Sequence, residues 1–259
     1  MQNNAFKSTF LHIGKTGGSA IKEALKRAIK EQDIYANANK LKDNTELEIK
    51  RLSGRFDQII LHGHGKTLKQ IPESDWFFFC IRNPISRYVS GFYSRKRQGK
   101  PRYNIPWNIK EKRAFKHFNT PNELAEALSS DNPKIRRRAK RAMKNIRHVK
   151  SSLSKWIANP SYFEKRVHKL LFILEQETLR EDFQILLQNL HFKKELNLST
   201  DRAVTHQANT TKSDTTLSDL AIENLNQHYS QDIEIYKFLT EAKIKKQRLF
   251  SNGGSENTF

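Results

Sequence analysis

The sequence predicts a single-domain α/β fold with a mostly parallel sheet flanked by helices. Three short apolar runs, at residues 8–13, 57–62 and 76–81, are typical of buried strands. Helical periodicity follows the first and third runs, and strands that alternate with helices form parallel sheets. No internal repeat or interdomain linker divides the 259 residues. Ligands of such folds bind at the carboxyl ends of the strands, where the polar motifs of this chain begin.

The first strand leads into a glycine-rich turn and a helix expected over residues 18–31. Gly17 and Gly18 allow a tight turn and a close approach of a ligand to the main chain. A helix start presents free N–H groups and the positive end of its dipole, and Lys15 adds a full charge. The segment predicts an anion cradle, with an ordinary turn and a solvated lysine as the alternative. The candidate residues are Lys15, Thr16, Gly17, Gly18, Ser19 and Ala20.

This cradle is P-loop-like, but it is not a standard Walker A loop. Gly14, Lys15 and Thr16 match the end of that motif, whereas Thr9 stands where its first glycine is required. A nucleoside triphosphatase is therefore disfavoured.

The strand over residues 76–81 ends at a second anion-binding motif. An Asn-Pro pair can cap and begin a helix over residues 84–97. Arg82 lies at the end of the strand, and Arg87 and Ser90 share one face of that helix. Guanidinium groups match phosphate oxygens, so these side chains predict a second phosphate site.

Exposed arginines on a surface helix are the alternative for this second motif. That alternative accounts for Arg95 and Arg97, which we expect to lie in solvent, but not for Arg82, which directly follows an apolar strand. Two anion sites of different chemistry indicate a ligand that carries phosphate at two places.

His62 and His64 follow the strand over residues 57–62. A histidine is the usual base near neutral pH, so His64 is a candidate for proton removal. Two satisfied histidines at the end of a strand are the alternative. A metal site is disfavoured, because no further cysteine or carboxylate ligand lies close by in the sequence.

Together these motifs resemble those of sulfotransferases that use 3′-phosphoadenosine 5′-phosphosulfate (PAPS). The Lys15 loop is similar to the family's 5′-phosphosulfate loop. Arg82 and Ser90 are similar to its 3′-phosphate motif, an arginine followed eight residues later by a serine. The closest likeness is to carbohydrate O-sulfotransferases of the uronyl 2-O type, which carry a His-Gly-His like residues 62–64. Further similar stretches, which extend the likeness over most of residues 8–240, are 171–174, 178–183, 209–212 and 232–236.

The resemblance implies an enzyme that moves a sulfuryl group from PAPS to a hydroxyl by in-line displacement, with PAP as product and no metal. It implies that His64 takes the acceptor proton and that Lys15 neutralises charge on the leaving phosphate. His62 would orient His64 or contact the sugar. The resemblance also implies a lid over the nucleotide, formed by Thr210, Thr211 and Lys212.

Residues 100–119 are expected to form a loop that lines the acceptor cleft. Tyr103 and Trp107 can stack on sugar rings there, with core anchors as the alternative, and Arg87 is a further candidate contact. Residues 33–55 are polar and receive no assignment. The remaining elements expected are helices over 121–130, 133–158, 216–228 and 230–247, a strand over 170–174 and a helix opened by a Thr178–Glu181 capping box. The domain is expected to span residues 1–250, and residues 251–259 to be disordered.

The chain is strongly basic, with 47 Lys and Arg against 27 Asp and Glu and a net charge of +20. The excess concentrates in residues 133–150, which hold nine basic residues and no acid. Such a field attracts polyanions, so we expect a glycan or another hydroxylated acceptor that is itself acidic. Nucleic acid is disfavoured, because no helix-turn-helix, zinc finger or RNA-binding aromatic signature is present. A solvated basic helix is the alternative.

The remaining features concern the cellular compartment. Cys80 is the single cysteine, lies in an apolar strand and excludes an internal disulfide. No apolar run is long enough to span a bilayer, and no signal core begins the sequence. We therefore expect a cytoplasmic protein. Because eukaryotic glycan sulfotransferases of this type carry a Golgi anchor, we expect a bacterial one.

Two other functions stay open at this point. One is a P-loop small-molecule kinase, which would need Mg²⁺ and ATP. The other is a non-catalytic polyanion-binding protein that has kept the fold without turnover.

Overall fold

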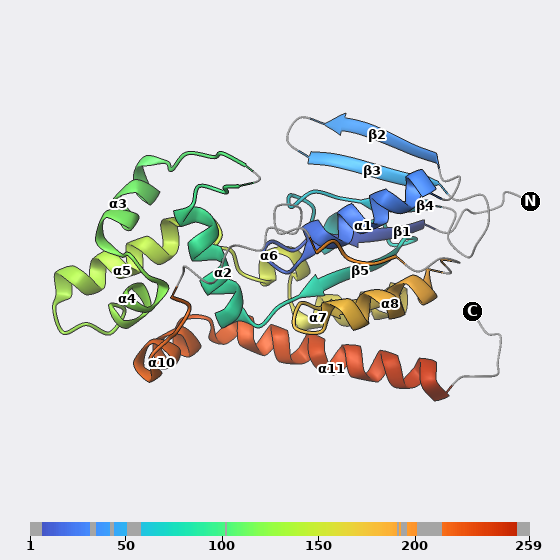
Figure 1. Ribbon diagram of the computed structural model, residues 1–259. Coiled ribbons are helices and arrows are strands. Elements are labelled where there is room, and N and C mark those ends of the chain that lie inside the picture. Colours follow the sequence, from blue (N-terminus) through green and yellow to red (C-terminus); the bar gives the residue numbers. More distant parts are fainter. Residues whose placement is uncertain are drawn as a thin grey trace, which may run out of the picture.

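The computed structural model describes residues 7–31, 35–41, 44–50, 58–101, 103–190, 192, 196–200 and 214–252. It shows one α/β domain built on a six-stranded sheet in the order β2-β3-β4-β1-β5-β6 (Figure 1). The strands are β1 (Lys7–Leu11), β2 (Tyr35–Leu41), β3 (Asn44–Lys50), β4 (Gln58–Leu61), β5 (Trp76–Ile81) and β6 (Leu170–Glu175). Strands β4, β1, β5 and β6 run parallel, so the predicted mostly parallel sheet is confirmed.

Helices cover both faces of the sheet and continue beyond one end of it (Figure 1). Those among the described residues are α1 (Gly18–Glu31), α2 (Pro84–Lys96), α3 (Ile109–His117), α4 (Pro121–Glu126), α5 (Pro133–Asn145), α6 (Ser154–Ile157), α7 (Pro160–Arg166), α8 (Leu179–Asn189), α10 (Asp219–His228) and α11 (Ser230–Asn252), with short 3₁₀ turns at Leu68–Gln70 and Val167–Lys169. Across these described residues, none of the helices is both long and apolar enough to cross a bilayer.

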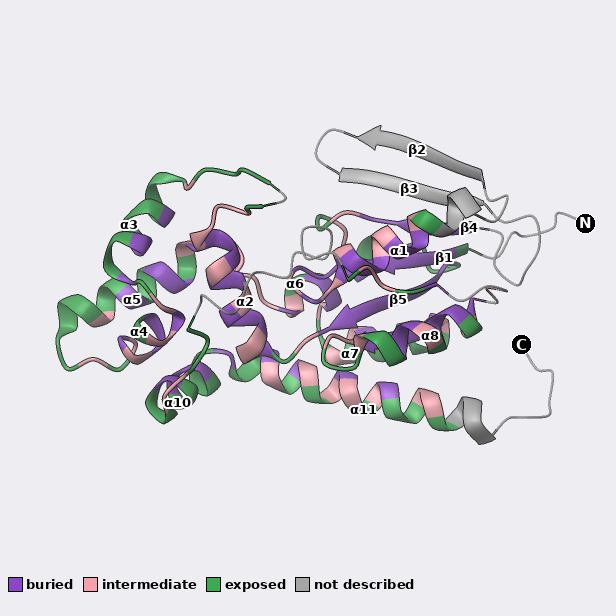
Figure 2. Cartoon of the chain, in the orientation of Figure 1, coloured by how far each residue is buried: buried purple, intermediate pink, exposed green. Residues whose placement is uncertain are grey.

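Strand β5 is buried over its whole length and separates two layers of the core (Figure 2). Side chains alternate along a strand, so Phe78 and Cys80 face one layer, which contains α1 and α8. Phe77 and Phe79 face the other layer, which contains α6, α7 and α11. Burial on both faces explains the continuous apolar run Trp76–Ile81 and why the sequence located this strand at its actual bounds.

A third core holds the helices beyond the sheet. Helices α2, α3, α4, α5 and α10 pack there around Phe92, Phe115 and Met143. Arg95 on α2 and Glu111 on α3 form a fully buried ion pair, with 2.7 Å between Nη2 and Oε2. The expectation that Arg95 lies in solvent is therefore wrong. The guanidinium is 1% exposed and also donates to the carbonyls of Ile105 and Pro106.

The β2–β3 hairpin falls in the region 33–55 that received no assignment. Strand β2 reads Tyr-Ala-Asn-Ala-Asn-Lys-Leu, and Ala, Asn and Lys are all depleted in strands. The hairpin joins the sheet through antiparallel pairing of β3 with β4, in which Leu47 lies opposite Leu61 and Ile49 opposite Ile59. Pairing with a distant strand, and not local propensity, specifies these two strands.

Three other expectations need correction. Residues 100–119 contain helix α3, which begins at a capping box between Asn108 and Glu111. The helix expected over residues 133–158 ends at Asn145, and the chain is irregular until α6. Thr178 precedes α8 as predicted, but it makes no capping box, because its hydroxyl donates instead to Asp182 (2.9 Å).

Candidate active site at the carboxyl edge of the parallel strands

The loops after β4, β1 and β5 meet at one edge of the sheet, because these three strands are parallel neighbours. In the strand register, Phe10 lies opposite Leu61 and Leu11 lies opposite Phe79. The residues that follow therefore emerge almost level. They are His12, His62 and, after two further residues of β5, Arg82.

The glycine-rich loop is shaped by close packing. Gly17 has φ +92°, and a Cβ at that position would lie 2.7 Å from Leu179 Cδ2. At Gly18 a Cβ would lie 2.3 Å from Cδ2 of His12, so the His12 ring fills the space of a side chain there. Ala20 N–H donates to the Gly17 carbonyl (2.9 Å) and closes the first turn of α1. The Ala20 N–H is thereby engaged, which leaves the N–H groups of Gly18 and Ser19, ahead of it in the first turn, as the candidates to meet an anion.

Thr16 supports the loop through its side chain. It is fully buried, and its hydroxyl donates to the Ile13 carbonyl (3.0 Å). Its own carbonyl accepts from Sγ of the buried Cys80 (2.7 Å), which ties the loop to β5. The expected use of the Thr16 hydroxyl as an anion donor is therefore corrected, because that hydroxyl is already engaged within the loop. Ser19 stays partly exposed.

Two arginines, Arg82 after β5 and Arg97 at the end of α2, lie near Lys15. Burial lowers the pKa of Lys15 to about 8, and the charges of Arg97 and Arg82 lower it further. Arg82 is held by Ser86, with 2.8 Å from Nε to Oγ, and Ser86 in turn donates to Glu177 (3.3 Å). Burial also lowers the pKa of Arg82, while Glu177 opposes the shift. Like charges are costly to gather without a counterion, so the cluster favours an anionic ligand.

His64 lies over the same loop. Its ring is 3.7 Å from the ring of His12 between centroids, and its Nδ1 lies 3.9 Å from the position of a Cβ on Gly14. Its carbonyl accepts from Nε1 of Trp156 (3.0 Å). His64 is exposed as a whole residue, but its ring is partly buried against the loop. That burial, followed by the charge of Lys22, lowers its pKa to about 4, against a hydrogen bond with the His12 main chain. The imidazole is therefore neutral near pH 7 and able to accept a proton.

A family model described as "Sulfotransferase family" matches residues 3–239, nearly the whole chain. The chain belongs to the sulfotransferase family. A comparison with curated proteins returned no match. Enzymes of this family transfer sulfuryl groups to hydroxylated acceptors and generally take them from PAPS.

The first histidine of the His-Gly-His sequence, His62, is more deeply buried than His64. It is 5% exposed, and its carbonyl accepts from Nζ of Lys22 (3.1 Å). Burial, followed by Lys66 and Lys22, lowers the pKa of His62 to about 4. His62 therefore holds Lys22 beside the cradle through its main chain.

Two candidates for the acceptor site are engaged elsewhere in this sulfotransferase. Arg87 is 3% exposed, pairs with Asp232 (3.0 Å) and donates to the Ser151 carbonyl. Trp107 donates from Nε1 to the Arg95 carbonyl (2.6 Å), and its ring stacks on Phe115 at 5.0 Å. Both expectations are corrected, because a buried ion pair holds Arg87 and the helical core holds Trp107. Tyr103 is 49% exposed on the turn after α2, so its ring remains accessible.

Ser90 lies on α2, partly exposed, eight residues after Arg82. The lid candidates Thr210, Thr211 and Lys212 lie outside the described residues. Among the described residues, no group of three or more His, Cys, Asp or Glu side chains is arranged to hold a metal ion.

Sequence reasoning missed Arg97 and His148 and did not single out Lys22. Arg97 was expected in solvent, but its Nη1 is buried, and its charge acts on Lys15. Burial lowers the pKa of His148 to about 3, with Lys15 and His64 as the nearest contributing charges. Lys22 lies about one helical turn after the start of α1 at Gly18 and could have been found by periodicity. His148 is positioned by packing on Gly91, where a Cβ would lie 3.2 Å from its own Cβ, and nothing local in the sequence signals that contact.

Proposed function

We propose that this sulfotransferase transfers the sulfuryl group of PAPS to a carbohydrate hydroxyl, in the manner of the uronyl 2-O type, with His64 as the base. The observation that carries the proposal is the meeting of Lys15, Arg82 and a neutral His64 on the loops of three adjacent parallel strands. One cradle for the phosphosulfate and one for a second phosphate, with a base between the cradle and solvent, match the needs of this transfer.

The residues present fit PAPS by charge. Lys15, Arg82 and Arg97 gather at the glycine loop, and the first N–H groups of a helix have no acceptor within it. When bound, PAPS supplies an activated sulfuryl group on its 5′-phosphate. Lys15 and the loop 15–20 would hold that 5′ end, and Arg82 with Ser90 the 3′-phosphate. Thr210, Thr211 and Lys212 are the proposed lid.

His64 would accept the hydroxyl proton as the acceptor oxygen bonds to sulfur and the bond from sulfur to the phosphate oxygen breaks. Lys15 would neutralise the charge that develops on that phosphate oxygen. His12 supports the His64 ring from beneath. The cations around His64 keep it unprotonated before the donor binds, and a bound anion offsets their charge and restores basicity where it is needed.

Replacement of the base tests this assignment. We expect His64→Ala to lower turnover about 10²–10⁴-fold while PAP affinity is retained, because a general base contributes that much to proton transfer. His168→Ala provides the control, since His168 is exposed on the turn Val167–Lys169. Turnover would be followed with labelled PAPS against a panel of neutral and uronate polysaccharides. Activity that survives the His64 change removes His64 from the role of base.

The donor would be established by titration of PAP against ATP without Mg²⁺. Membership of the sulfotransferase family and the absent first glycine of a Walker motif weigh against the kinase alternative. Binding of PAP that depends on its 3′-phosphate supports the proposal, whereas ATP binding restored by Mg²⁺ overturns it. We propose the cytoplasm of a bacterium as the setting, where PAPS is made.

A further inference from the structure

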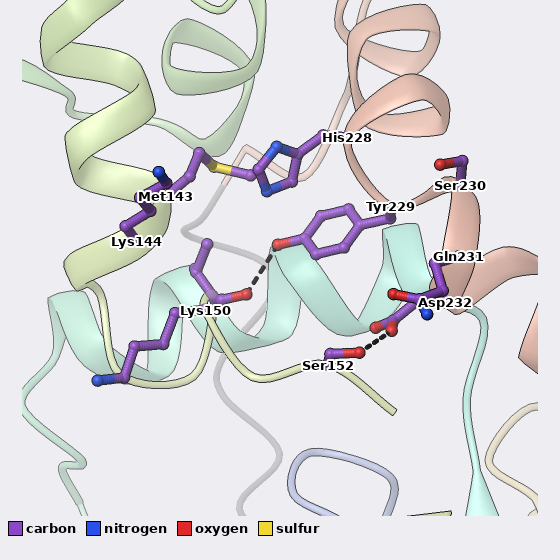
Figure 3. A pocket seen from close by; sticks show the side chains of 10 residues that line it. Met143, Lys144, Lys150, Ser152, His228, Tyr229, Ser230, Gln231 and Asp232 are labelled. Atoms are coloured by element: carbon purple, nitrogen blue, oxygen red, sulfur yellow. Dashed lines mark hydrogen bonds between the residues drawn. The ribbon is translucent and has the colours of Figure 1, made fainter. Parts of the chain in front are cut away.

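A second concave site lies away from the Lys15 loop, between the end of α5, residues 146–152 and the start of α11 (Figure 3). Its volume is about 510 Å³, within the range of roughly 300–1,000 Å³ typical of small-ligand sites. The lining residues are Met143, Lys144, Val149, Lys150, Ser152, His228, Tyr229, Ser230, Gln231 and Asp232. We name it the α5–α11 pocket.

Two lysines give this pocket its charge. Lys144 and Lys150 lie on the α5 side of the pocket, across from Ser230 and Gln231 (Figure 3). Both lysines are exposed, and neither forms an ion pair with a carboxylate in the described part of the chain. The rim of the pocket on the α5 side therefore carries two exposed lysines without a carboxylate partner among the described residues, with the Lys150 side chain directed away from the far wall (Figure 3).

The acid at the back of the pocket does not neutralise these lysines. Asp232 is 2% exposed and already pairs with Arg87 at 3.0 Å. It also accepts from the Leu153 N–H (2.9 Å) and from the Ser152 hydroxyl, the contact drawn in Figure 3. Its charge is balanced by a buried guanidinium, which leaves the pocket with a positive balance from Lys144 and Lys150.

The pocket opens beside the most basic helix of the chain. Helix α5 carries no acid and seven basic residues, namely Lys134, Arg136, Arg137, Arg138, Lys140, Arg141 and Lys144. A long polyanion attracted to this helix meets the pocket at its carboxyl end. Polar groups on the far wall, Ser230, Gln231 and His228, can satisfy hydroxyl groups, and the ring of Tyr229 offers an apolar floor.

A chain of three contacts links the back of the pocket to the candidate active site. Asp232 pairs with Arg87, whose guanidinium carbon lies 5.9 Å from the Trp156 ring centre. Trp156 donates to the His64 carbonyl. Segment 146–152 also carries His148, whose pKa responds to His64, and it lines the pocket with Val149, Lys150 and Ser152. These contacts join the back of the pocket to the candidate active site through the interior of the protein.

We propose that the α5–α11 pocket binds an acidic sugar unit, a uronate or a sulfated ring, of the same polymeric acceptor whose hydroxyl reacts at His64. The inference rests on the proposed function and names the class of acceptor, an acidic polysaccharide. Lys144 and Lys150 would contact the carboxylate or sulfate. The pocket would then select for chain length and charge at a distance from the reacting hydroxyl.

The test compares two pairs of lysines on the same helical region. Heparin-derived oligosaccharides of short and long chain length serve as the probe, and their binding is measured by titration at fixed ionic strength. We expect Lys144→Gln with Lys150→Gln to weaken binding of the long chains about tenfold. The control, Lys134→Gln with Lys140→Gln, removes the same charge from exposed positions of α5 outside the pocket and should cost about twofold at most. Equal losses in both pairs mean diffuse attraction and overturn the proposal.

A second variant fills the α5–α11 pocket and leaves Lys144 and Lys150 unchanged. Ser230→Trp places a large side chain at the exposed wall of the pocket and should weaken the long oligosaccharides as much as the lysine pair does. Unchanged binding overturns the proposal, as does a duplex DNA of equal charge that competes as well as the oligosaccharide. PAP affinity, measured in parallel, reports folding and the donor site. If the unaltered protein does not bind PAP, the proposed function is wrong. The comparison of the two lysine pairs would still show whether the α5–α11 pocket binds the oligosaccharide.

Discussion

At the scale of single residues, the site is defined by charges of one sign held close together. The charges of Arg97 and Arg82 lower the pKa of Lys15, and those of Lys22 and Lys15 lower the pKa of His64. Burial is the largest cause in each case. An anionic ligand reverses these penalties, so donor binding and proton uptake are linked.

The pH dependence of donor binding follows from Lys15. Its pKa is lowered to about 8, so we expect PAP affinity to fall as the pH rises through that value and the ammonium is lost.

The free energy of unfolding of the ligand-free protein should instead increase as the pH rises. The unfolded state holds this proton more tightly between about 8 and 10.5, so stability rises with pH across that window. Titrations of PAP below and above pH 8 measure the first effect. Lys15→Arg should flatten the PAP curve, because an arginine stays charged, and parallel curves for the two proteins would contradict the assignment.

Arg82 should recognise the 3′-phosphate. We expect Arg82→Ala to weaken PAP about ten- to hundredfold, because a charge-assisted contact contributes roughly 1.5–3 kcal/mol. Adenosine 5′-phosphosulfate, which lacks the 3′-phosphate, should lose much less. Arg180→Ala is the control, as Arg180 is exposed on α8. Equal losses for both nucleotides would remove Arg82 from this role.

At the scale of elements, helix α2 couples the donor site to the helical end of the molecule. It begins at Asn83, whose side chain caps Ile85 and Ser86, and it ends beside the loop that carries Tyr103. Two buried ion pairs fasten it, Arg87 with Asp232 of α11 and Arg95 with Glu111 of α3.

The Arg95–Glu111 pair gives a prediction about stability. Glu111→Ala leaves a buried guanidinium without its partner, and we expect a loss of about 3–5 kcal/mol in the free energy of unfolding. Replacement of both residues, Arg95→Met with Glu111→Leu, should cost much less, because no charge stays buried. Glu23→Ala, which breaks the more exposed Lys26–Glu23 pair, should cost below about 1 kcal/mol. Urea denaturation measures all three. A Glu111→Ala protein as stable as the Glu23→Ala protein would show that the buried pair does not stabilise the fold.

The sequence located the elements whose signal is local. The run Trp76–Ile81, the Asn-Pro helix start and the glycine-rich turn need no distant partner, and they carry most of the candidate donor site. The sequence did not locate the β2–β3 hairpin or the end of α5, because tertiary contacts determine both. The sequence predicted site or surface roles for Arg87, Arg95 and Trp107. It does not show their partners, which are distant in the chain: Asp232 for Arg87, Glu111 for Arg95 and Phe115 for Trp107. Arg97 and His148 were missed as site residues for the same reason, because contacts between distant parts of the chain bring them to the site.

At the scale of the whole molecule, the fold separates the basic residues behind the net charge of +20 into two main groups. The donor cluster sits at the sheet edge, and the largest run of cations lies on α5 at the far end of the helical core (Figure 1). A small donor nucleotide touches the first group alone, whereas a polymeric acceptor can span both.

Salt should separate these two kinds of binding. Exposed charges are screened over about 10 Å at 0.1 M ionic strength, whereas partly buried groups are screened less. We therefore expect the affinity for long heparin-derived chains to fall steeply between low and moderate salt, and PAP affinity to fall only slightly. Titrations of both ligands across a salt series check this. A PAP affinity that falls as steeply as the heparin affinity would mean that the donor site is as open to solvent as α5.

The ring of His12 occupies the volume that a side chain at position 18 would need, and the same ring lies against His64. Positions 12, 18 and 64 are therefore not free to vary one at a time. A larger residue at position 18 is compatible with the fold only if position 12 shrinks, and a smaller residue at position 12 withdraws the support beneath His64. Substitutions in the proposed donor cradle and at the proposed base are thus epistatic, and a redesign of donor specificity has to change all three positions as one unit.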